Sequence, residues 1–270
     1  MARRGAFLFL VRYAGALHLA ALVRDRNLVV LDPRGTGWSK PGLTCRENED
    51  AADCLSHWRA SGVDLTRYQS AATADDVEAL RRALGIERWN LYGLSYGTRL
   101  AQTLLRRHPQ HVRSAILDSL AAPQEDEIAG ASPGAAHAIQ RLIDACATDA
   151  VCDRRYPDVA WVFSEASFFE TCRAAGSPHP PASENEPLRS DVPALLLTGR
   201  FDPVTPVEAA RLVVRTLTRA YVVEFPTLGH GVWSQSACAR RIGLAFLAAP
   251  LRPPDTSCVA SVPSVRWAAP

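Results

Sequence analysis

The sequence lacks the features that mark several classes of protein. No apolar run reaches the roughly 18 residues that a membrane-spanning helix requires, so we expect no membrane span. The 30 basic and 28 acidic residues leave a net charge of only +2, and no basic stripe carries interleaved aromatic residues. We therefore expect no nucleic acid among the partners. No cysteine pair has the Cys-x-x-Cys spacing of a zinc knuckle, and we expect neither a metal nor another cofactor.

Cysteine itself occurs seven times, and six of the seven form couples that are close in the sequence. The couples are Cys45 with Cys54, Cys146 with Cys152, and Cys238 with Cys258, which leaves Cys172 over. Three local loops closed by disulfides would place the protein in an oxidising compartment. We therefore predict a secreted or cell-wall protein. The alternative is a cytoplasmic protein with buried free thiols.

The N-terminus carries a second indication of export. Arg3 and Arg4 precede the apolar run 5–11, which resembles a signal peptide. Arg12 ends this run early, and no clean cleavage site follows it. The expectation of export therefore rests mainly on the cysteines.

The remaining chain alternates between strand patterns and helix patterns. A hydrophobic content of 47% over 270 residues supports one large α/β domain. The predicted strands cover residues 27–31, 89–92, 114–117, 192–197 and 221–224. The predicted helices cover residues 73–84, 96–107, 134–147, 160–174 and 237–247, and a further helix begins at a capping box of Thr205 and Glu208. Strands separated by helices pair in parallel through right-handed crossovers, which predicts a doubly wound α/β sheet.

Residues 121–190 interrupt this alternation. They are rich in proline, alanine, serine and glutamate, and we interpret them as a small helical cap over the sheet. The chain then divides into residues 1–120 and 191–270, which form the two parts of the core, with the cap inserted between them.

A Gly-x-Ser-x-Gly motif follows the second predicted strand, because residues 93–97 read Gly-Leu-Ser-Tyr-Gly. Such a motif turns a strand tightly into a helix and holds its serine in a strained conformation, and side chains larger than glycine at the flanks would collide. Ser95 is therefore the candidate nucleophile. The backbone N–H of Tyr96, at the start of the next helix, is a candidate donor to an oxyanion.

Two further candidates follow predicted strands. Asp202 comes after the fourth strand and His230 after the fifth. A serine nucleophile needs a base that takes its proton and a buried carboxylate that holds the imidazole tautomer, and the carboxyl ends of parallel strands lie at one edge of a sheet. The order Ser95, Asp202, His230 is the order used by α/β hydrolases. Asp118, at the end of the third strand, is the rival acid.

Two other histidines have a simpler interpretation. His108 and His111 flank Pro109 at the end of the predicted helix 96–107. Because an imidazole near a helix C-terminus interacts favourably with the helix dipole, we interpret both as helix caps.

Several of these segments resemble one family. The loop 31–39, Leu-Asp-Pro-Arg-Gly-Thr-Gly-Trp-Ser, and the motif at 93–98 are similar to proline iminopeptidase-like α/β hydrolases. Residues 198–206, Thr-Gly-Arg-Phe-Asp-Pro-Val-Thr-Pro, together with Gly229-His230-Gly231 and the last cysteine couple, look like the C-terminal region of bacterial tripeptidyl aminopeptidases. The resemblance covers about residues 22–118 and 188–260.

This resemblance implies an α/β-hydrolase fold and a secreted or cell-wall serine exopeptidase without metal or cofactor. Such enzymes release proline or short peptides from the N-terminus of a substrate. By the same resemblance, Ser95 is the nucleophile, His230 the general base and Asp202 the acid that orients it, with the N–H of Tyr96 as one oxyanion donor.

The sequence departs from the family in two places. Family members carry a His-Gly-Gly-Pro-Gly-type loop that supplies the second oxyanion donor, whereas residues 1–26 contain no match and their nearest glycine is Gly15. The family's cap is also longer and holds the substrate's free amine with acidic residues, for which Glu165 is the candidate here. The resemblance is therefore to a member that is shortened at its N-terminus and has a reduced cap.

We expect a serine hydrolase that acts through an acyl-enzyme on a short peptide or a small ester. Aminopeptidase activity is the leading expectation. A small carboxylesterase is the alternative, because a shortened cap opens the pocket and removes amine recognition. A truncated, non-catalytic hydrolase homologue is the alternative of another class, because the loop that carries the second oxyanion donor is not found.

Overall fold

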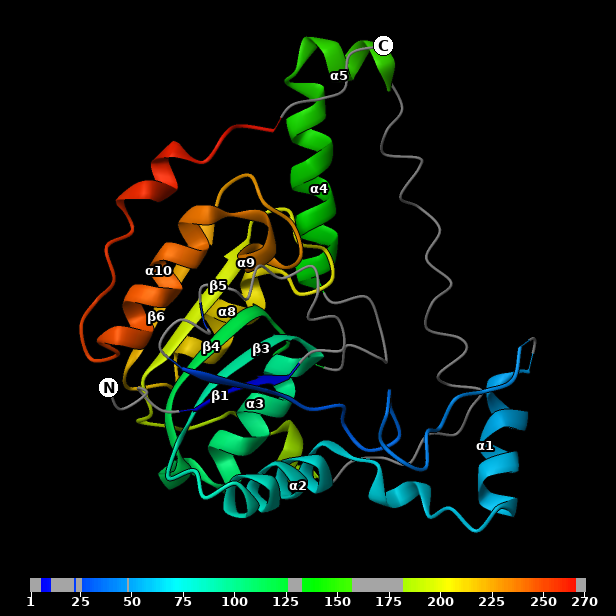
Figure 1. Cartoon of the computed structure of the whole chain (residues 1–270). Coiled ribbons are helices and arrows are strands. Elements are labelled where there is room, and N and C mark those ends of the chain that lie inside the picture. Colours follow the sequence, from blue (N-terminus) through cyan, green and yellow to red (C-terminus); the bar gives the residue numbers. More distant parts are fainter. Residues whose placement is uncertain are drawn as a thin grey trace.

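A six-stranded parallel sheet forms the centre of the molecule (Figure 1). The computed structural model describes residues 6–10, 22, 26–47, 49–125, 133–156 and 182–265. The strands are β1 (Ala6–Leu10), β2 (Asn27–Val30), β3 (Trp89–Ser95), β4 (Val112–Leu120), β5 (Ala194–Gly199) and β6 (Ala220–Phe225). Their order across the sheet is β2-β1-β3-β4-β5-β6. The predicted parallel α/β sheet is thus confirmed.

Helices cover both faces of this sheet. The helices are α1 (Ala51–Ala60), α2 (Ser70–Ala83), α3 (Tyr96–Arg107), α4 (Pro133–Ala147), α5 (Ala150–Arg155), α8 (Val207–Val214), α9 (Val232–Gln235) and α10 (Ala237–Ala248). Residues of α2, α3 and α8 join one buried cluster, and residues of α9 and α10 join another. The sheet separates the two clusters, so the fold is doubly wound as predicted.

The inner strands are apolar on both sides because both faces are covered. In β5, Ala194 and Leu196 pack in the cluster of α2, α3 and α8, while Leu195 and Leu197 pack in the cluster of α9 and α10. Successive side chains of a strand point to opposite faces, so a strand buried on both sides reads as a continuous apolar run. Polar chemistry is therefore left to the loops that follow the strands.

The apolar run 5–11, which resembles a signal peptide in the sequence, contains strand β1. This strand lies inside the sheet, where Leu8 aligns with Val29 of β2 and with Leu91 of β3. A short apolar strand and the apolar part of a signal peptide have the same local composition. The pairing with β3, which is distant in the sequence, makes this segment a strand of the sheet. The run therefore no longer supports the expectation of export.

The insertion between β4 and β5 contains α4 and α5. Helix α4 agrees with the predicted helix 134–147 and extends away from the sheet in Figure 1, with α5 across its far end. The predicted helix 160–174 lies outside the described residues. In the part of the chain that is described, no helix is both long enough and apolar enough to cross a membrane.

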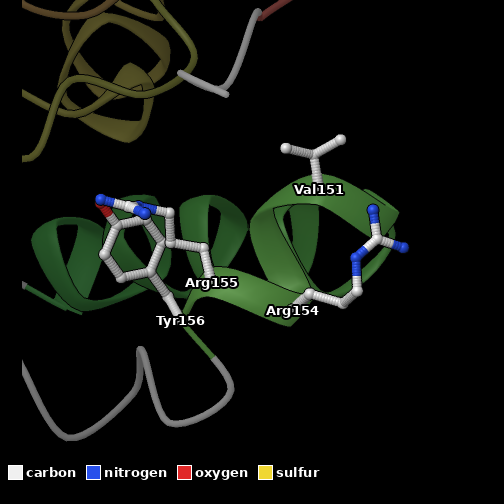
Figure 2. Close-up of a pocket in the computed structure, with 4 residues that line it drawn as sticks. All are labelled: Val151, Arg154, Arg155 and Tyr156. Atoms are coloured by element: carbon white, nitrogen blue, oxygen red, sulfur yellow. The ribbon is translucent and has the colours of Figure 1, made fainter. Parts of the chain in front are cut away.

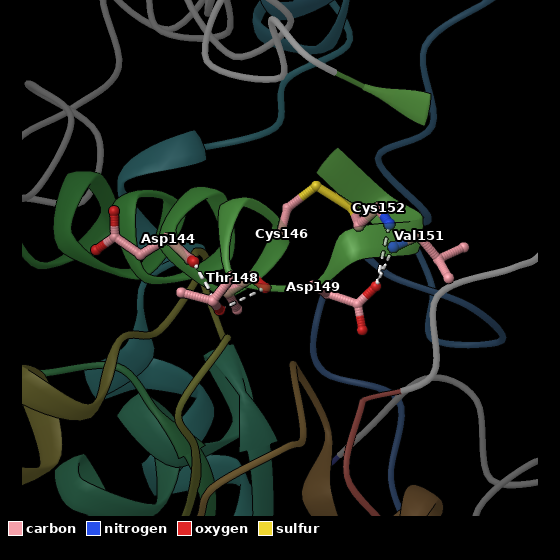
Figure 3. Close-up of a disulfide and its surroundings, with 7 residues drawn as sticks. Asp144, Cys146, Thr148, Asp149, Val151 and Cys152 are labelled. Atoms are coloured by element: carbon pink, nitrogen blue, oxygen red, sulfur yellow. Dashed lines mark hydrogen bonds between the residues drawn. A yellow bond between two sulfur atoms is a disulfide. The ribbon is translucent and has the colours of Figure 1, made fainter. Parts of the chain in front are cut away.

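All three predicted disulfides are present. They join Cys45 to Cys54, Cys146 to Cys152, and Cys238 to Cys258. The second disulfide links the end of α4 to α5 (Figure 3), where Asp149 accepts hydrogen bonds from the N–H groups of Val151 at 2.9 Å and Cys152 at 3.0 Å. Three disulfides are consistent with an extracellular protein. Cys172 lies outside the described residues.

Candidate active site

Ser95 occupies a strained turn between β3 and α3. Its φ of 55° and ψ of −125° place a non-glycine residue in a region that side chains rarely adopt. A Cβ atom on Gly93 would collide with the carbonyl oxygen of Gly97, so the motif requires glycine at its first position. The turn leaves Tyr96 as the first residue of α3, where backbone N–H groups lack partners within the helix.

Asp202 lies in the loop after β5 and is completely buried. Its Oδ1 atom accepts hydrogen bonds from the N–H groups of Val204 at 2.9 Å and Thr205 at 3.0 Å. Its Oδ2 atom accepts one from the Thr205 hydroxyl at 2.7 Å. These donors fix the carboxylate in one orientation and compensate for its removal from water.

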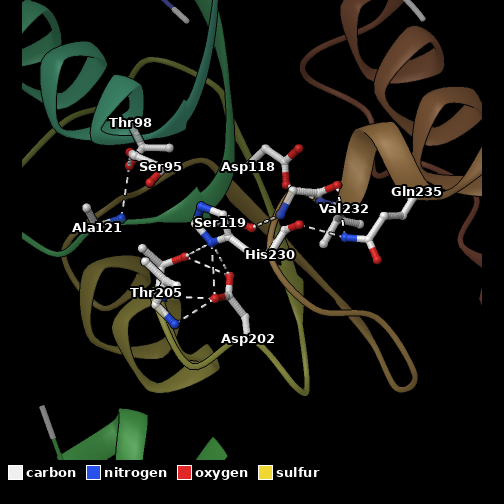
Figure 4. A network of polar contacts seen from close by, with 12 residues as sticks. Ser95, Thr98, Asp118, Ser119, Ala121, Asp202, Thr205, His230, Val232 and Gln235 are labelled. Atoms are coloured by element: carbon white, nitrogen blue, oxygen red, sulfur yellow. Dashed lines mark hydrogen bonds and ion pairs between the residues drawn. The ribbon is translucent and has the colours of Figure 1, made fainter. Parts of the chain in front are cut away.

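His230 lies in the loop after β6 and meets this carboxylate. Its Nδ1 atom is 2.9 Å from Oδ2 and 3.1 Å from Oδ1 of Asp202 (Figure 4). A proton on Nδ1 is thereby held by the carboxylate, and Nε2 is directed away from Asp202. In Figure 4 the imidazole is seen between Asp202 and Ser95. The sheet brings all three predicted residues to its carboxyl edge.

The surroundings of Asp202 determine its charge. Burial raises the pKa of this carboxyl. The hydrogen bond and the charge of His230, together with the two donors of Thr205, lower the pKa by more than burial raises it. The pKa of Asp202 therefore lies below its ordinary value, and the group is ionised at neutral pH. An ionised acid beside Nδ1 is the state that a histidine base requires.

Thr205 has a different role from the one predicted. The sequence predicts a helix cap, but the Thr205 hydroxyl donates to Asp202 and lies 3.2 Å from Nδ1 of His230. Helix α8 begins at Val207, with Pro206 as its cap. The capping box is therefore wrong, because a buried carboxylate three residues upstream holds the hydroxyl that the helix would have used. The Asp-Pro-Val-Thr spacing was the available signal for this contact.

The rival acid, Asp118, binds other partners. It is completely buried at the end of β4 and accepts hydrogen bonds from the Tyr92 hydroxyl at 2.7 Å and from the N–H groups of Val232 and Trp233. Burial raises the pKa of Asp118 to about 6, against the opposing effect of these donors and of the nearby His230. Asp202, and not Asp118, is thus the carboxylate within hydrogen-bond reach of Nδ1.

Helix α4, in the insertion between β4 and β5, is docked beside this site. The Arg141 guanidinium donates to Glu208 of α8 at 2.9 Å and to the carbonyl oxygen of Arg200 at 3.0 Å. Arg200 and Glu208 flank the loop that carries Asp202. Sequence reasoning missed Arg141, because nothing local links it to residues about 60 positions further along.

The two histidines interpreted as helix caps pair with acidic residues of α2. His108 Nε2 lies 3.0 Å from Asp75 and His111 Nδ1 lies 3.1 Å from Glu78. His108 is the C-cap residue of α3, as predicted, and its backbone N–H donates to the carbonyl oxygen of Leu104. The two side chains, however, lie beside carboxylates of α2 and not at the helix end. Glu78, His108 and His111 have the atom types of a metal site. However, Arg81 already donates two hydrogen bonds to Glu78, which neutralises the charge that a cation would need.

A hollow of about 470 Å³ lies beside α5 (Figure 2). Its described lining residues are Val151, Arg154, Arg155 and Tyr156, which include neither serine nor histidine. Figure 1 places α5 at the end of α4 that is remote from the sheet. The carboxyl edge of the sheet, with its serine, histidine and aspartate, has the chemistry that the hollow lacks. Glu165 and Gly15, the other residues singled out in the sequence, lie outside the described residues.

Known proteins resemble part of this chain. The serine protease Hip1 of Mycobacterium tuberculosis is 29% identical in an alignment 127 residues long, which covers 38% of this chain and 24% of that protein. The tripeptidyl aminopeptidase of Streptomyces lividans is 38% identical in an alignment 129 residues long, which covers 38% of this chain and 23% of that protein. The chain thus matches about a quarter of the length of these relatives.

A solved structure has a similar fold. Est816, described as an N-acyl homoserine lactone degrading enzyme, superposes with a TM-score of 0.53 at 23% identity, over 86% of this chain and 88% of that one. At this identity the likeness shows the fold alone.

Two families match the chain. The TAP-like protein family matches residues 161–258, in agreement with the resemblance of the C-terminal region to tripeptidyl aminopeptidases. The alpha/beta hydrolase fold family matches residues 16–170, more than half of the chain. The protein belongs to the alpha/beta hydrolase fold family.

Proposed function

We propose that the chain is a serine hydrolase that works through an acyl-enzyme. Ser95 Oγ attacks the substrate carbonyl carbon while His230 Nε2 takes the hydroxyl proton. The tetrahedral intermediate then expels the leaving amine or alcohol, which receives that proton from His230. Water attacks the acyl-enzyme by the same route and releases the acid and free Ser95. Asp202 holds the imidazole in the required tautomer throughout.

The contact between His230 and Asp202 is the single observation that carries this proposal. A buried, ionised carboxylate lies 2.9 Å from Nδ1, and a serine in a strained turn lies at the same edge of the sheet. The N–H of Tyr96 supports oxyanion stabilisation, because it lies at the positive end of the α3 dipole.

We propose an aminopeptidase that releases proline or short N-terminal peptides. Support comes from the TAP-like match over residues 161–258 and from the relative named tripeptidyl aminopeptidase. Residues 121–190 act in this proposal as a reduced cap between the two parts of the core. Glu165 binds the free amine of the substrate. A Glu165→Gln variant should then raise KM for substrates with a free N-terminus and leave KM unchanged for N-acetylated ones.

A fluorophosphonate probe tests the nucleophile. The wild type should be labelled and Ser95→Ala should not, while the control Ser61→Ala, at an exposed helix end, should be labelled like the wild type. Absence of labelling in folded wild-type protein would mean a non-catalytic homologue and would reject the proposal.

Chromogenic substrates separate the two kinds of hydrolase. An aminopeptidase should cleave the p-nitroanilides of Ala-Pro-Ala or Pro with a higher kcat/KM than it cleaves p-nitrophenyl butyrate. The reverse preference, or turnover of the ester alone, would replace the aminopeptidase with a small carboxylesterase. Either result leaves the roles of Ser95, Asp202 and His230 in place.

A further inference from the structure

The backbone N–H groups of the three residues that follow His230 all donate hydrogen bonds to side chains at the end of β4. The N–H of Gly231 donates to the Ser119 hydroxyl at 2.8 Å. The N–H groups of the next two residues, Val232 and Trp233, donate to the two oxygens of Asp118 at 3.0 and 2.9 Å. Two consecutive side chains at the end of β4 thus bind three consecutive backbone groups that lie more than 110 residues further along the chain.

Both side chains are built into the sheet. Asp118 and Ser119 are completely buried, and the Tyr92 hydroxyl of β3 donates to Oδ2 of Asp118 at 2.7 Å. Ser119 has a φ of 54°, although it is not glycine. A residue keeps such a strained backbone only where its surroundings over-determine it, and such residues cluster at functional sites.

The same end of β4 is also tied to the turn that carries Ser95. The N–H of Ala121 donates to the Thr98 hydroxyl at 2.9 Å, and that hydroxyl donates to the carbonyl oxygen of Ser95 at 2.6 Å. Figure 4 shows this chain of contacts on one side of β4 and the His230 loop on the other. The end of β4 therefore joins the loop of the proposed base to the turn of the proposed nucleophile.

We infer that Asp118 and Ser119 are positioning residues that fix the His230 loop relative to Ser95. The inference rests on the proposed function. Asp202 orients the imidazole ring through Nδ1, whereas Asp118 and Ser119 fix the backbone from which the ring extends. The hydrogen bond from the Gln235 side chain to the carbonyl oxygen of His230 holds the remaining side of this backbone. A loop without these anchors would let Nε2 drift from the serine hydroxyl.

Asp118→Asn is the sharpest test of this inference. An asparagine presents one oxygen and one NH2 group where Asp118 presents two oxygens, so either Val232 or Trp233 would direct its N–H at another donor. A displacement of about 1 Å at a reacting group can reduce the rate on the order of a hundredfold. We expect kcat for p-nitrophenyl butyrate to fall about ten- to a hundredfold, with KM unchanged, since neither residue contacts the substrate in this proposal.

Ser119→Ala removes one anchor without changing any charge. It should lower kcat with KM and the pH profile unchanged. Asp118→Asn should also move the acid limb of kcat/KM to lower pH, because the charge of Asp118 interacts with His230 and favours the protonated imidazole. If Asp118 and Ser119 only stabilised the fold, their replacement would change neither kcat of the folded protein nor the acid limb of kcat/KM.

Ser114→Ala is the matched control. Ser114 is completely buried at the start of the same strand and donates to Asn90 of β3 at 2.8 Å, so its loss weakens the same pair of strands away from the site. Ser114→Ala should lower the melting temperature without changing kcat.

Fluorophosphonate labelling of the wild type separates a failure of the proposed function from a failure of this inference. If the wild type is not labelled and shows no turnover, the proposed function fails. If the wild type is active and the folded Asp118→Asn and Ser119→Ala variants both keep its kcat, only the inference about positioning is overturned.

Discussion

Asp202 has a charge and an orientation that depend on its immediate neighbours. Val204 supplies one donor and Thr205 two donors to the same carboxylate, and His230 is the third residue that contacts it. An amide in place of the carboxylate would direct an NH2 group or a single oxygen at the same donors. The imidazole would then lose the acceptor that selects its tautomer.

Asp202→Asn should therefore abolish most of the proposed activity without unfolding the protein. By analogy with serine hydrolases that have lost this carboxylate, we expect kcat to fall by about 10³–10⁴-fold. Steady-state turnover of p-nitrophenyl butyrate provides the measurement. Asp255→Asn is the control, because Asp255 is exposed near the C-terminus and caps only its own turn. A kcat within tenfold of the wild type for Asp202→Asn would assign the acid role elsewhere, first of all to Asp118.

From the sequence alone, only those residues of the candidate site that belong to recognisable motifs could be predicted. Ser95, Asp202 and His230 could be found because each follows an apolar strand in a recognisable local pattern. The roles of Asp118 and Ser119 could not, because their partners are brought to them only by the order of the strands. The hydroxyl of Thr205 was assigned to the wrong partner: in a helix cap its oxygen would accept a hydrogen bond from a backbone N–H, whereas here the hydroxyl donates to Asp202.

The ion pair between Glu78 and Arg81 within α2 gives an element-scale example of pH-dependent stability. Glu78 of α2 is buried with Arg81, which donates to both of its oxygens, and His111 lies beside it. The hydrogen bonds of Arg81, opposed by burial, hold the pKa of Glu78 at about 2, below its ordinary 4.5. Because the folded state binds this proton less readily than the unfolded state, the stabilisation is complete above pH 4.5 and is lost as the pH falls from 4.5 towards 2.

Glu78→Gln should lower the free energy of unfolding at pH 7 by about 2 kcal/mol, since Arg81 loses a charged acceptor. The difference between wild type and variant should shrink between pH 4.5 and pH 2. Urea titrations across this range provide the measurement. Glu87→Gln serves as the control, because the Glu87 side chain is 94% exposed and should show no such dependence. A difference that stays constant with pH would contradict the assigned cause.

The elements themselves were predictable where an apolar run has a clear boundary. The predicted strands at 89–92 and 192–197 overlap β3 and β5, and the predicted helix 237–247 agrees with α10. The first helix pattern, 73–84, begins three residues too late, because Gln69 precedes α2 without a side-chain cap that could mark its start. Strand β1 was misread because its identity depends on pairing and not on its own composition.

Across the whole molecule, the three disulfides close loops of different size. The sequence separations are 20 residues for Cys238–Cys258, 9 for Cys45–Cys54 and 6 for Cys146–Cys152. In the chain-entropy account, a longer closed loop restricts the unfolded chain more. The C-terminal disulfide, which joins α10 to the 3-10 helix η6 (Ser257–Ser261), should therefore contribute most.

Replacing both cysteines by serine tests this ranking. The Cys238→Ser/Cys258→Ser variant should lose about 3 kcal/mol of unfolding free energy, and the Cys146→Ser/Cys152→Ser variant about 2 kcal/mol. Calorimetric melting of each variant, with and without reductant, provides the measurement. Reductant should lower the melting temperature of the wild type more than that of either variant. A larger loss for the shorter loop would show that packing around α4 and α5, and not loop closure, dominates.

The inner position of β1 has a consequence for the chain while it is still being made. Ala6 aligns with Trp89, which leaves the ribosome 83 residues later (89 − 6 = 83). At about 5–20 residues per second, β3 arrives roughly 4–17 s after its neighbour. During that interval the apolar segment Ala6–Leu10 has only β2 as a partner within the sheet. The rate of translation should therefore affect the fraction of nascent chains that fold before this apolar segment aggregates with another chain.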